Sequence, residues 1–79
     1  MKRLLDQPAT YRIQVQGRLH EDWSIWFEGM HVAVESDDTG ATTTTLTGVV
    51  ADQAALYGLI SRVRDMGLPL LLVQYVKQG

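Results

Sequence analysis

The sequence predicts an α+β fold of the ferredoxin-like class, βαββαβ, in which a four-stranded antiparallel sheet carries two helices on one face. Two observations predict it. A strand, helix, strand unit is expected over residues 11–35, and a second unit of the same kind over residues 42–77. Right-handed crossovers in both units would place the two helices on the same side of the sheet. The opposite side of the sheet would be open.

The first unit begins with strict alternation of apolar and polar residues over 11–19, which is typical of a half-buried strand. Residues 20–29 are expected to form a short helix, because Asp22 is a suitable N-cap and Gly29 can end the helix in a left-handed conformation. The apolar face of this helix would contain Trp23, Trp26, Phe27 and Met30.

A hairpin is expected next, because residues 30–35 alternate again and turn-forming residues fill positions 36–40. The return strand at 42–50 is rich in β-branched residues, and its expected core residues are Leu46 and Val50. The hairpin therefore links the two units.

The second helix is predicted from its ends and its periodicity. Asp52 is a good N-cap, and Gly67 followed by Pro69 ends the helix. Its apolar stripe consists of Leu56, Leu59, Ile60, Val63 and Met66. The last strand, at 70–77, is apolar on both faces, so both faces are expected to be covered.

Length and composition limit the domain organisation of the protein and the means by which its fold is stabilised. The 79 residues allow one domain, expected at 11–79 after a flexible leader at 1–10. A chain of this size buries only about 60% of the surface that its unfolded form exposes. It has no cysteine, so neither disulfides nor thiolate zinc sites can stabilise it, and oligomerisation is the remaining means.

The charge balance argues against two classes of partner. Seven Lys and Arg against nine Asp and Glu give a formal net charge of -2, which provides no net attraction for nucleic acid or for anionic membranes. The N-terminal residues lack the apolar run of a signal peptide, and no stretch is long and apolar enough to span a membrane. A cytoplasmic location is therefore predicted.

Four motifs carry a resemblance to known proteins: YRIQVQG, WSIWF-E-G, TTTTLTG and DQAALYGLISRVRDMGLPLL. Through them, residues 11–73 resemble a group of short bacterial proteins with no assigned activity, which implies an independent small domain. Residues 52–73 are also similar to the helix and following strand of ACT-type regulatory domains, which bind amino acids at a dimer interface. The Asp-x-Pro-Gly turn of those domains is not present at 52–55.

Two other families with this topology are excluded by their residues. The VQGR segment at 15–18 is similar to the phosphate-binding segment of acylphosphatases, but those enzymes need a catalytic asparagine and this chain contains none. RNA-recognition domains stack bases on aromatic residues of the two central strands. Here the strand at 42–50 offers threonines instead.

One cluster of titratable residues flanks the first predicted helix, and it consists of His20, Glu21, Asp22 and His31. A metal site needs three or four ligands that converge at about 2 Å, which three consecutive residues do not provide. Helix capping and surface roles are therefore favoured. No metal site, cofactor or catalytic residue is predicted, and the protein is expected not to be an enzyme.

Two surfaces are candidates for ligand binding. The aromatic residues of the first helix could line a pocket, although their spacing already matches a buried helix face. The polar sides of the strands at 11–19 and 42–50 could form a ligand-binding sheet face. Together the candidate residues are Arg12, Gln14, Gln16, Arg18, Thr43, Thr45, Thr47, Trp23 and Trp26.

The predicted function is a small non-catalytic interaction or regulatory module that forms a homodimer or higher oligomer, because one layer of helices can cover only one face of the last strand. The predicted dimer interface on the other face comprises Val49, Leu70, Leu72 and Val76. One competing prediction is a metabolite-binding domain or small dimeric enzyme, with its pocket between the sheet and the helix of Trp23 and Trp26. Another is an adaptor that binds a protein through an edge strand.

Overall fold

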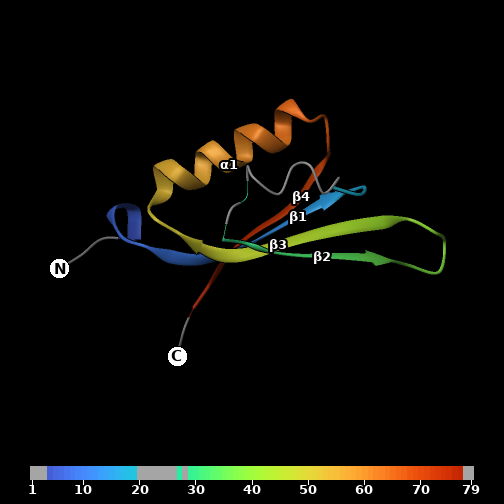
Figure 1. The fold of residues 1–79 in the computed structure, drawn as a ribbon, viewed down its shortest axis with the longest axis horizontal. Helices are drawn as coiled ribbons and strands as arrows, with labels where there is room; N and C mark the ends of the chain where they lie inside the picture. The colour runs from blue at the N-terminus through green and yellow to red at the C-terminus, as the bar shows by residue number, and fades with distance from the viewer. Residues whose placement is uncertain (1–3, 20–26, 28, 78–79) are drawn as a thin grey trace.

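The computed structural model describes residues 4–19, 27 and 29–77. Its elements follow one another along the chain as η1 (Leu4–Asp6), β1 (Ala9–Gln16), β2 (His31–Ser36), β3 (Thr42–Val50), α1 (Gln53–Asp65) and β4 (Leu70–Val76). The strands form one sheet, and α1 lies across one face of it (Figure 1).

The sheet has the strand order β2-β3-β1-β4, and every neighbouring pair is antiparallel. Strands β1 and β3 are therefore central, while β2 and β4 form the two edges. Ile13 of β1 lies between Leu46 of β3 and Val73 of β4. Because directly opposite residues in an antiparallel pair point to the same side, the registers show which residues share each face.

The predicted ferredoxin-like βαββαβ arrangement with two helices is wrong. The described residues contain one α-helix, and more of them belong to the four strands of the sheet than to that helix. The helix predicted at 20–29 lies outside the described residues except for Phe27 and Gly29. There the Met30 N–H donates to the Phe27 carbonyl oxygen at 3.0 Å, a single i to i+3 turn. A helix of two turns is far shorter than the roughly 12–15 residues at which isolated helices become stable.

The second predicted helix is present as α1. The Asp52 carboxylate accepts a hydrogen bond from the Ala55 N–H at 2.8 Å, which caps the helix. At the other end, Met66 donates its N–H to the Arg62 carbonyl oxygen, and Gly67 has a positive φ of 76°. The local sequence signals that predicted this helix therefore mark where it begins and where it ends.

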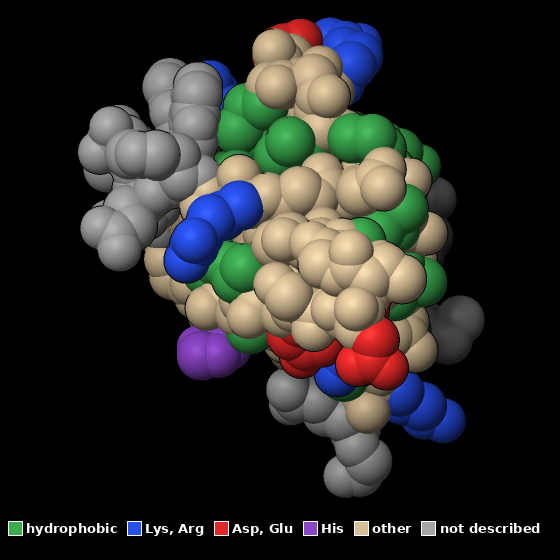
Figure 2. All heavy atoms as spheres, turned by 90° about the vertical axis from the view of Figure 1, so that its right-hand side faces the viewer, with side chains coloured by type: hydrophobic (Ala, Val, Ile, Leu, Met, Phe, Trp, Pro, Cys, Tyr) green, Lys and Arg blue, Asp and Glu red, His purple; other side chains and the backbone are tan. Residues whose placement is uncertain are grey.

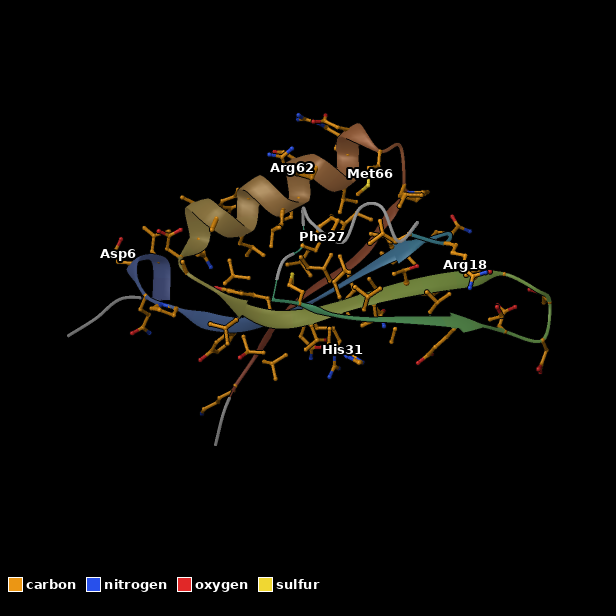
Figure 3. The ribbon with its side chains drawn as sticks, viewed as in Figure 1. Asp6, Arg18, Phe27, His31, Arg62 and Met66 are labelled. Carbon is orange, nitrogen blue, oxygen red and sulfur yellow. The ribbon has the colours of Figure 1, made fainter. Side chains whose placement is uncertain are left out.

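The core lies between α1 and the side of the sheet that faces it, and Figure 3 shows Phe27 in this layer. Its buried hydrophobic side chains are Tyr11, Ile13, Val15, Leu19, Phe27, Leu46, Val50, Leu56 and Val63. The fully buried Thr44 is the polar exception. Its hydroxyl donates to the Gly17 carbonyl oxygen at 2.7 Å and accepts from the Leu19 N–H at 3.1 Å, so the chain leaving β1 is tied to β3.

Gly48 lets another segment cross this face of the sheet closely. It lies opposite Tyr11, so it belongs to the side that faces α1. A Cβ atom at Gly48 would be 3.1 Å from both the Gly29 carbonyl oxygen and the Met30 Cα. The missing side chain therefore allows the backbone that leads into β2 to pass over β3.

Candidate interaction surface

The last strand, β4, is an edge strand whose apolar side chains are exposed. Every residue from Leu70 to Tyr75 is exposed, and only Val76 is partly buried. The exposed fractions are Leu70 43%, Leu71 53%, Leu72 36%, Val73 37% and Tyr75 47%. The expectation that both faces of this strand are covered is therefore wrong for the single chain. An exposed apolar edge strand also presents unpaired backbone groups to any strand that approaches it.

A β-bulge divides the apolar residues of β4 between the two faces of the sheet. Leu72 lies opposite Gln14 and Leu70 lies opposite Val15, with the register shift between Gln14 and Val15. Leu72 therefore points away from α1, whereas Leu70 shares the face of the buried Val15. The predicted dimer face assumed unbroken alternation, which would have placed both leucines on the outer side.

The other residues of the predicted dimer face are separated by a polar row. Val49 and Val76 both lie opposite Thr10, so they flank it on the outer side. The next row on that side pairs Arg12 with Thr47 and Gln74. The three outward apolar residues, Val49, Leu72 and Val76, therefore do not form one continuous outer patch.

On the helix side, the edge residues extend the core without being covered by α1. Val73 lies opposite the fully buried Ile13, yet it is 37% exposed. Tyr75 lies opposite Tyr11, and their ring centroids are 6.0 Å apart. The Tyr11 hydroxyl accepts a hydrogen bond from Gln53 Nε2 at 3.0 Å, which places the start of α1 above β1. The helix thus shields the central strands and leaves β4 open.

Figure 2 looks at the molecule from the hairpin end of the sheet. Hydrophobic side chains gather in the upper part and along the right-hand side of this view, and acidic side chains lie at the lower end and at the very top. The unequal distribution agrees with the exposed fractions of the individual residues. Apolar side chains thus lie along the edge of the sheet, and charged side chains lie at the turn.

The predicted polar sheet face exists, and its members contact one another. Six of the candidate residues form opposite pairs on the outer side, namely Arg12 with Thr47, Gln14 with Thr45 and Gln16 with Thr43. Gln14 Nε2 donates to Thr45 Oγ1 at 3.3 Å, and an Arg12 guanidinium nitrogen donates to Gln74 Oε1 at 3.5 Å. Exposed Arg18 follows the end of β1, and Figure 3 shows it beyond the strand. Trp23 and Trp26 lie outside the described residues.

Hydrogen bonds to the Asp37 carboxylate shape the hairpin between β2 and β3. The pKa of Asp37 is lowered, first by the hydrogen bond that its carboxylate accepts from the Thr39 hydroxyl at 2.6 Å. The backbone N–H groups of Thr39 and Ala41 also donate to Asp37 Oδ1, at 2.8 and 3.0 Å. Asp37 is exposed in the hairpin between β2 and β3, so these bonds shape the turn.

Two of the hollows that the described residues line adjoin the sheet. One, of about 320 Å³, lies at the ends of β1, β3 and β4. It is lined by Gln7, Pro8, Ala9, Thr10, Val49, Tyr75 and Val76. The other, of about 180 Å³, is lined by Met30, Val49, Val50, Ala51, Ala55 and Leu59. Over the described ranges, no three His, Asp or Glu residues come together as a metal site.

The comparisons with known proteins add a family. A family model described as a domain of unknown function (DUF8691) matches residues 10–74. The chain belongs to this family. No curated protein and no solved structure matches the chain. The matched range begins within β1 and ends at Gln74, so it includes the first five residues of the exposed edge strand, Leu70 to Gln74.

In the described part of the chain, no helix has the length and apolar character needed to cross a membrane.

Sequence reasoning identified β4 as unusual but missed that Val73 and Tyr75 would be exposed on the helix side. The apolar character of both faces, over 70–77, was the available signal. It did not show which strand would lie at the edge, because that depends on pairing between distant segments.

Proposed function

We propose that this protein is a small non-catalytic module that acts by self-association, with β4 as its contact strand. The observation that carries the proposal is an edge strand with apolar side chains exposed on both of its faces. Monomeric proteins usually protect such an edge with charges, proline, a bulge or a covering segment. The bulge at Leu70–Leu72 is the only such device seen within β4 among the described residues.

The accessible surface of the chain is larger than that of a compact monomer of the same mass. The chain has an accessible surface of 5597 Å², whereas a compact monomer of 8.8 kDa would have roughly 4,800 Å². This excess agrees with the apolar side chains that β4 leaves exposed. The radius of gyration is 13.0 Å, against about 11.6 Å for a compact domain of this length. A partner at the edge or against a face of such a flat molecule would bury surface that the single chain leaves exposed.

The sequence also suggested a metabolite-binding domain or a small dimeric enzyme, and the described geometry favours this function less. The larger hollow is at the lower end of the range of roughly 300–1,000 Å³ for ligand pockets. The polar sheet residues Gln14, Thr45, Arg12 and Gln74 already bond to one another. The pocket expected beside Trp23 and Trp26 lies outside the described residues.

Light scattering coupled to size-exclusion chromatography tests the proposal. The purified protein should have about twice the 8.8 kDa mass of the chain at micromolar concentration, and should dissociate on dilution. A mass equal to one chain across the micromolar to sub-millimolar range would overturn self-association. Adding metabolite pools to such a monomer and following its thermal unfolding would then test the ligand-binding alternative.

A further inference from the structure

We infer that two copies of the chain join edge to edge, with their β4 strands paired antiparallel about a two-fold axis at Gln74. This inference rests on the proposed self-association and specifies its partner surface. Four strands from each copy would form one continuous eight-stranded sheet, with both α1 helices on the same face. An interface of this kind is isologous, since the same strand contributes from both sides.

The positions of the exposed apolar residues favour a contact between copies through the edge strand over a contact through the outer face of the sheet. Stacking of two outer faces would bury the polar row of Arg12, Thr47 and Gln74 together with the valines and Leu72. It would also leave Val73 and Tyr75 exposed, because they lie on the helix side. Edge pairing brings Leu72, Val73, Tyr75 and Val76, which lie on both sides of β4, against the same four residues of the second copy. It also satisfies unpaired backbone groups of the edge strand.

The register follows from matching side chains across the axis. Pairing centred on Gln74 places Leu72 opposite the second copy's Val76, and Val73 opposite the second copy's Tyr75, and the two Gln74 amides meet. Every apolar residue from 72 to 76 then has an apolar partner on the same face, including the favourable pair of an aromatic with a β-branched residue. Centring the pair on Val73 would instead set Leu72 opposite Gln74.

The other edge strand is less suited to this role. Strand β2 carries His31 and Glu35 on its outer side, opposite Thr47 and Thr43. Its helix-side residues, Val32 and Val34, are 37% and 39% exposed. Glu35 places a negative charge on this edge, and a charged side chain on an edge strand opposes pairing with another strand. Strand β4 has no charged residue between Leu70 and Val76.

Distances between spin labels distinguish the possible arrangements, and the chain contains no cysteine that would interfere. In the edge dimer, labels at Gln74→Cys should lie close enough for strong dipolar broadening, since directly opposite Cα atoms are about 5 Å apart. Labels at Thr45→Cys would lie five strand spacings apart across the sheet and labels at Glu35→Cys seven, so the two distances would be at least about 24 Å and about 34 Å. Close Thr45 labels would indicate stacked faces, and close Glu35 labels would indicate pairing through β2. Either result overturns the inference.

A matched pair of lysine substitutions provides a second measurement. Leu72→Lys changes an edge residue, and Val49→Lys changes an outward residue of central strand β3 that is 66% exposed. Leu72→Lys should raise the dissociation constant of the dimer about tenfold or more, because the substitution occurs twice in each dimer. Val49→Lys should leave the constant unchanged. Circular dichroism would verify that both variants fold.

The outcomes separate the two proposals. A monomeric unsubstituted protein would overturn both self-association and the edge arrangement. A dimer that is weakened by Val49→Lys and resists Leu72→Lys would keep self-association, and it would overturn both the role of β4 as the contact strand and the edge arrangement. A dimer weakened only by Leu72→Lys, with closely spaced Gln74 labels, supports both.

Discussion

The ring of Tyr75 lies 6.0 Å from the ring of Tyr11, with an angle of 56° between the two planes. Tyr11 is 3% exposed and belongs to the core, whereas Tyr75 is 47% exposed on the edge strand. A tilted aromatic pair at this distance is a favourable arrangement. It links the exposed strand to the core and to Gln53 of α1, which donates to the Tyr11 hydroxyl.

Replacing Tyr75 with alanine should therefore destabilise the fold. The loss of the ring pair alone should lower the free energy of unfolding by about 0.5–1.5 kcal/mol. Tyr57→Ala is the matched control, because Tyr57 is 62% exposed on α1, and its effect should stay within about 0.5 kcal/mol. Urea unfolding at one fixed protein concentration measures both. Equal effects of the two substitutions would contradict the role given to the Tyr11 pair.

Thr44→Val should be more damaging than its small change of shape suggests. The substitution removes the hydroxyl that bonds both the Gly17 carbonyl oxygen and the Leu19 N–H at a fully buried position. Leaving a buried polar group unsatisfied costs about 1–3 kcal/mol. Thr44→Ser keeps the hydroxyl, so it should retain more of the stability. If denaturation curves show valine to be tolerated better than serine, the hydrogen bonds are not what Thr44 contributes.

Asp52→Ala should weaken the start of α1. The carboxylate of Asp52 accepts from the Ala55 N–H, and loss of an N-cap of this kind costs about 1 kcal/mol. Asp52→Asn preserves an acceptor oxygen and should be close to the unsubstituted protein. Thermal unfolding followed by circular dichroism compares the three proteins, and an alanine variant as stable as the asparagine variant would refute the capping contribution.

The hairpin between β2 and β3 should contribute a pH dependence through Asp37. The Thr39 hydroxyl and the nearby N–H groups lower the pKa of Asp37 below its ordinary value of 3.8, so the folded state favours the ionised carboxylate. The stability that this provides is present above pH 3.8 and is lost as the pH falls through the lowered pKa. NMR titration of the carboxyl carbon should show the pKa rising toward 3.8 in Thr39→Ala, while Thr39→Ser should change it less. An unchanged pKa in the alanine variant would exclude the hydroxyl as the main cause.

Local patterns predicted those elements whose signals lie within the element. The cap at Asp52 and the stop at Gly67 bound α1, and the alternation over 11–19 marks β1, although the strand begins at Ala9 and ends at Gln16. The spacing of the aromatic residues at 23–30 also predicted a helix, on the same kind of local evidence. Its described end, from Phe27 to Met30, is a single turn next to the close crossing at Gly48.

The candidate interaction surface was only partly predictable. The two-sided apolar character of residues 70–77 is a property of the sequence, and it identified the strand on which the proposal rests. The prediction placed Leu70 on the outer side with Leu72, but one bulge shifts the register against Val15 and puts Leu70 on the helix side. No local pattern records a register shift against a strand more than fifty residues away.

The sequence by itself determined where β4 lies in the chain, that it would be apolar on both sides, and how α1 begins and ends, because neighbouring residues control propensity, capping and periodicity. Only the tertiary structure decided that β4 would be an edge, that α1 would leave Val73 and Tyr75 exposed, and that Leu70 and Leu72 would face opposite sides. These features depend on which distant strands pair and in which register, and such long-range pairing is selected by the packing of the whole core.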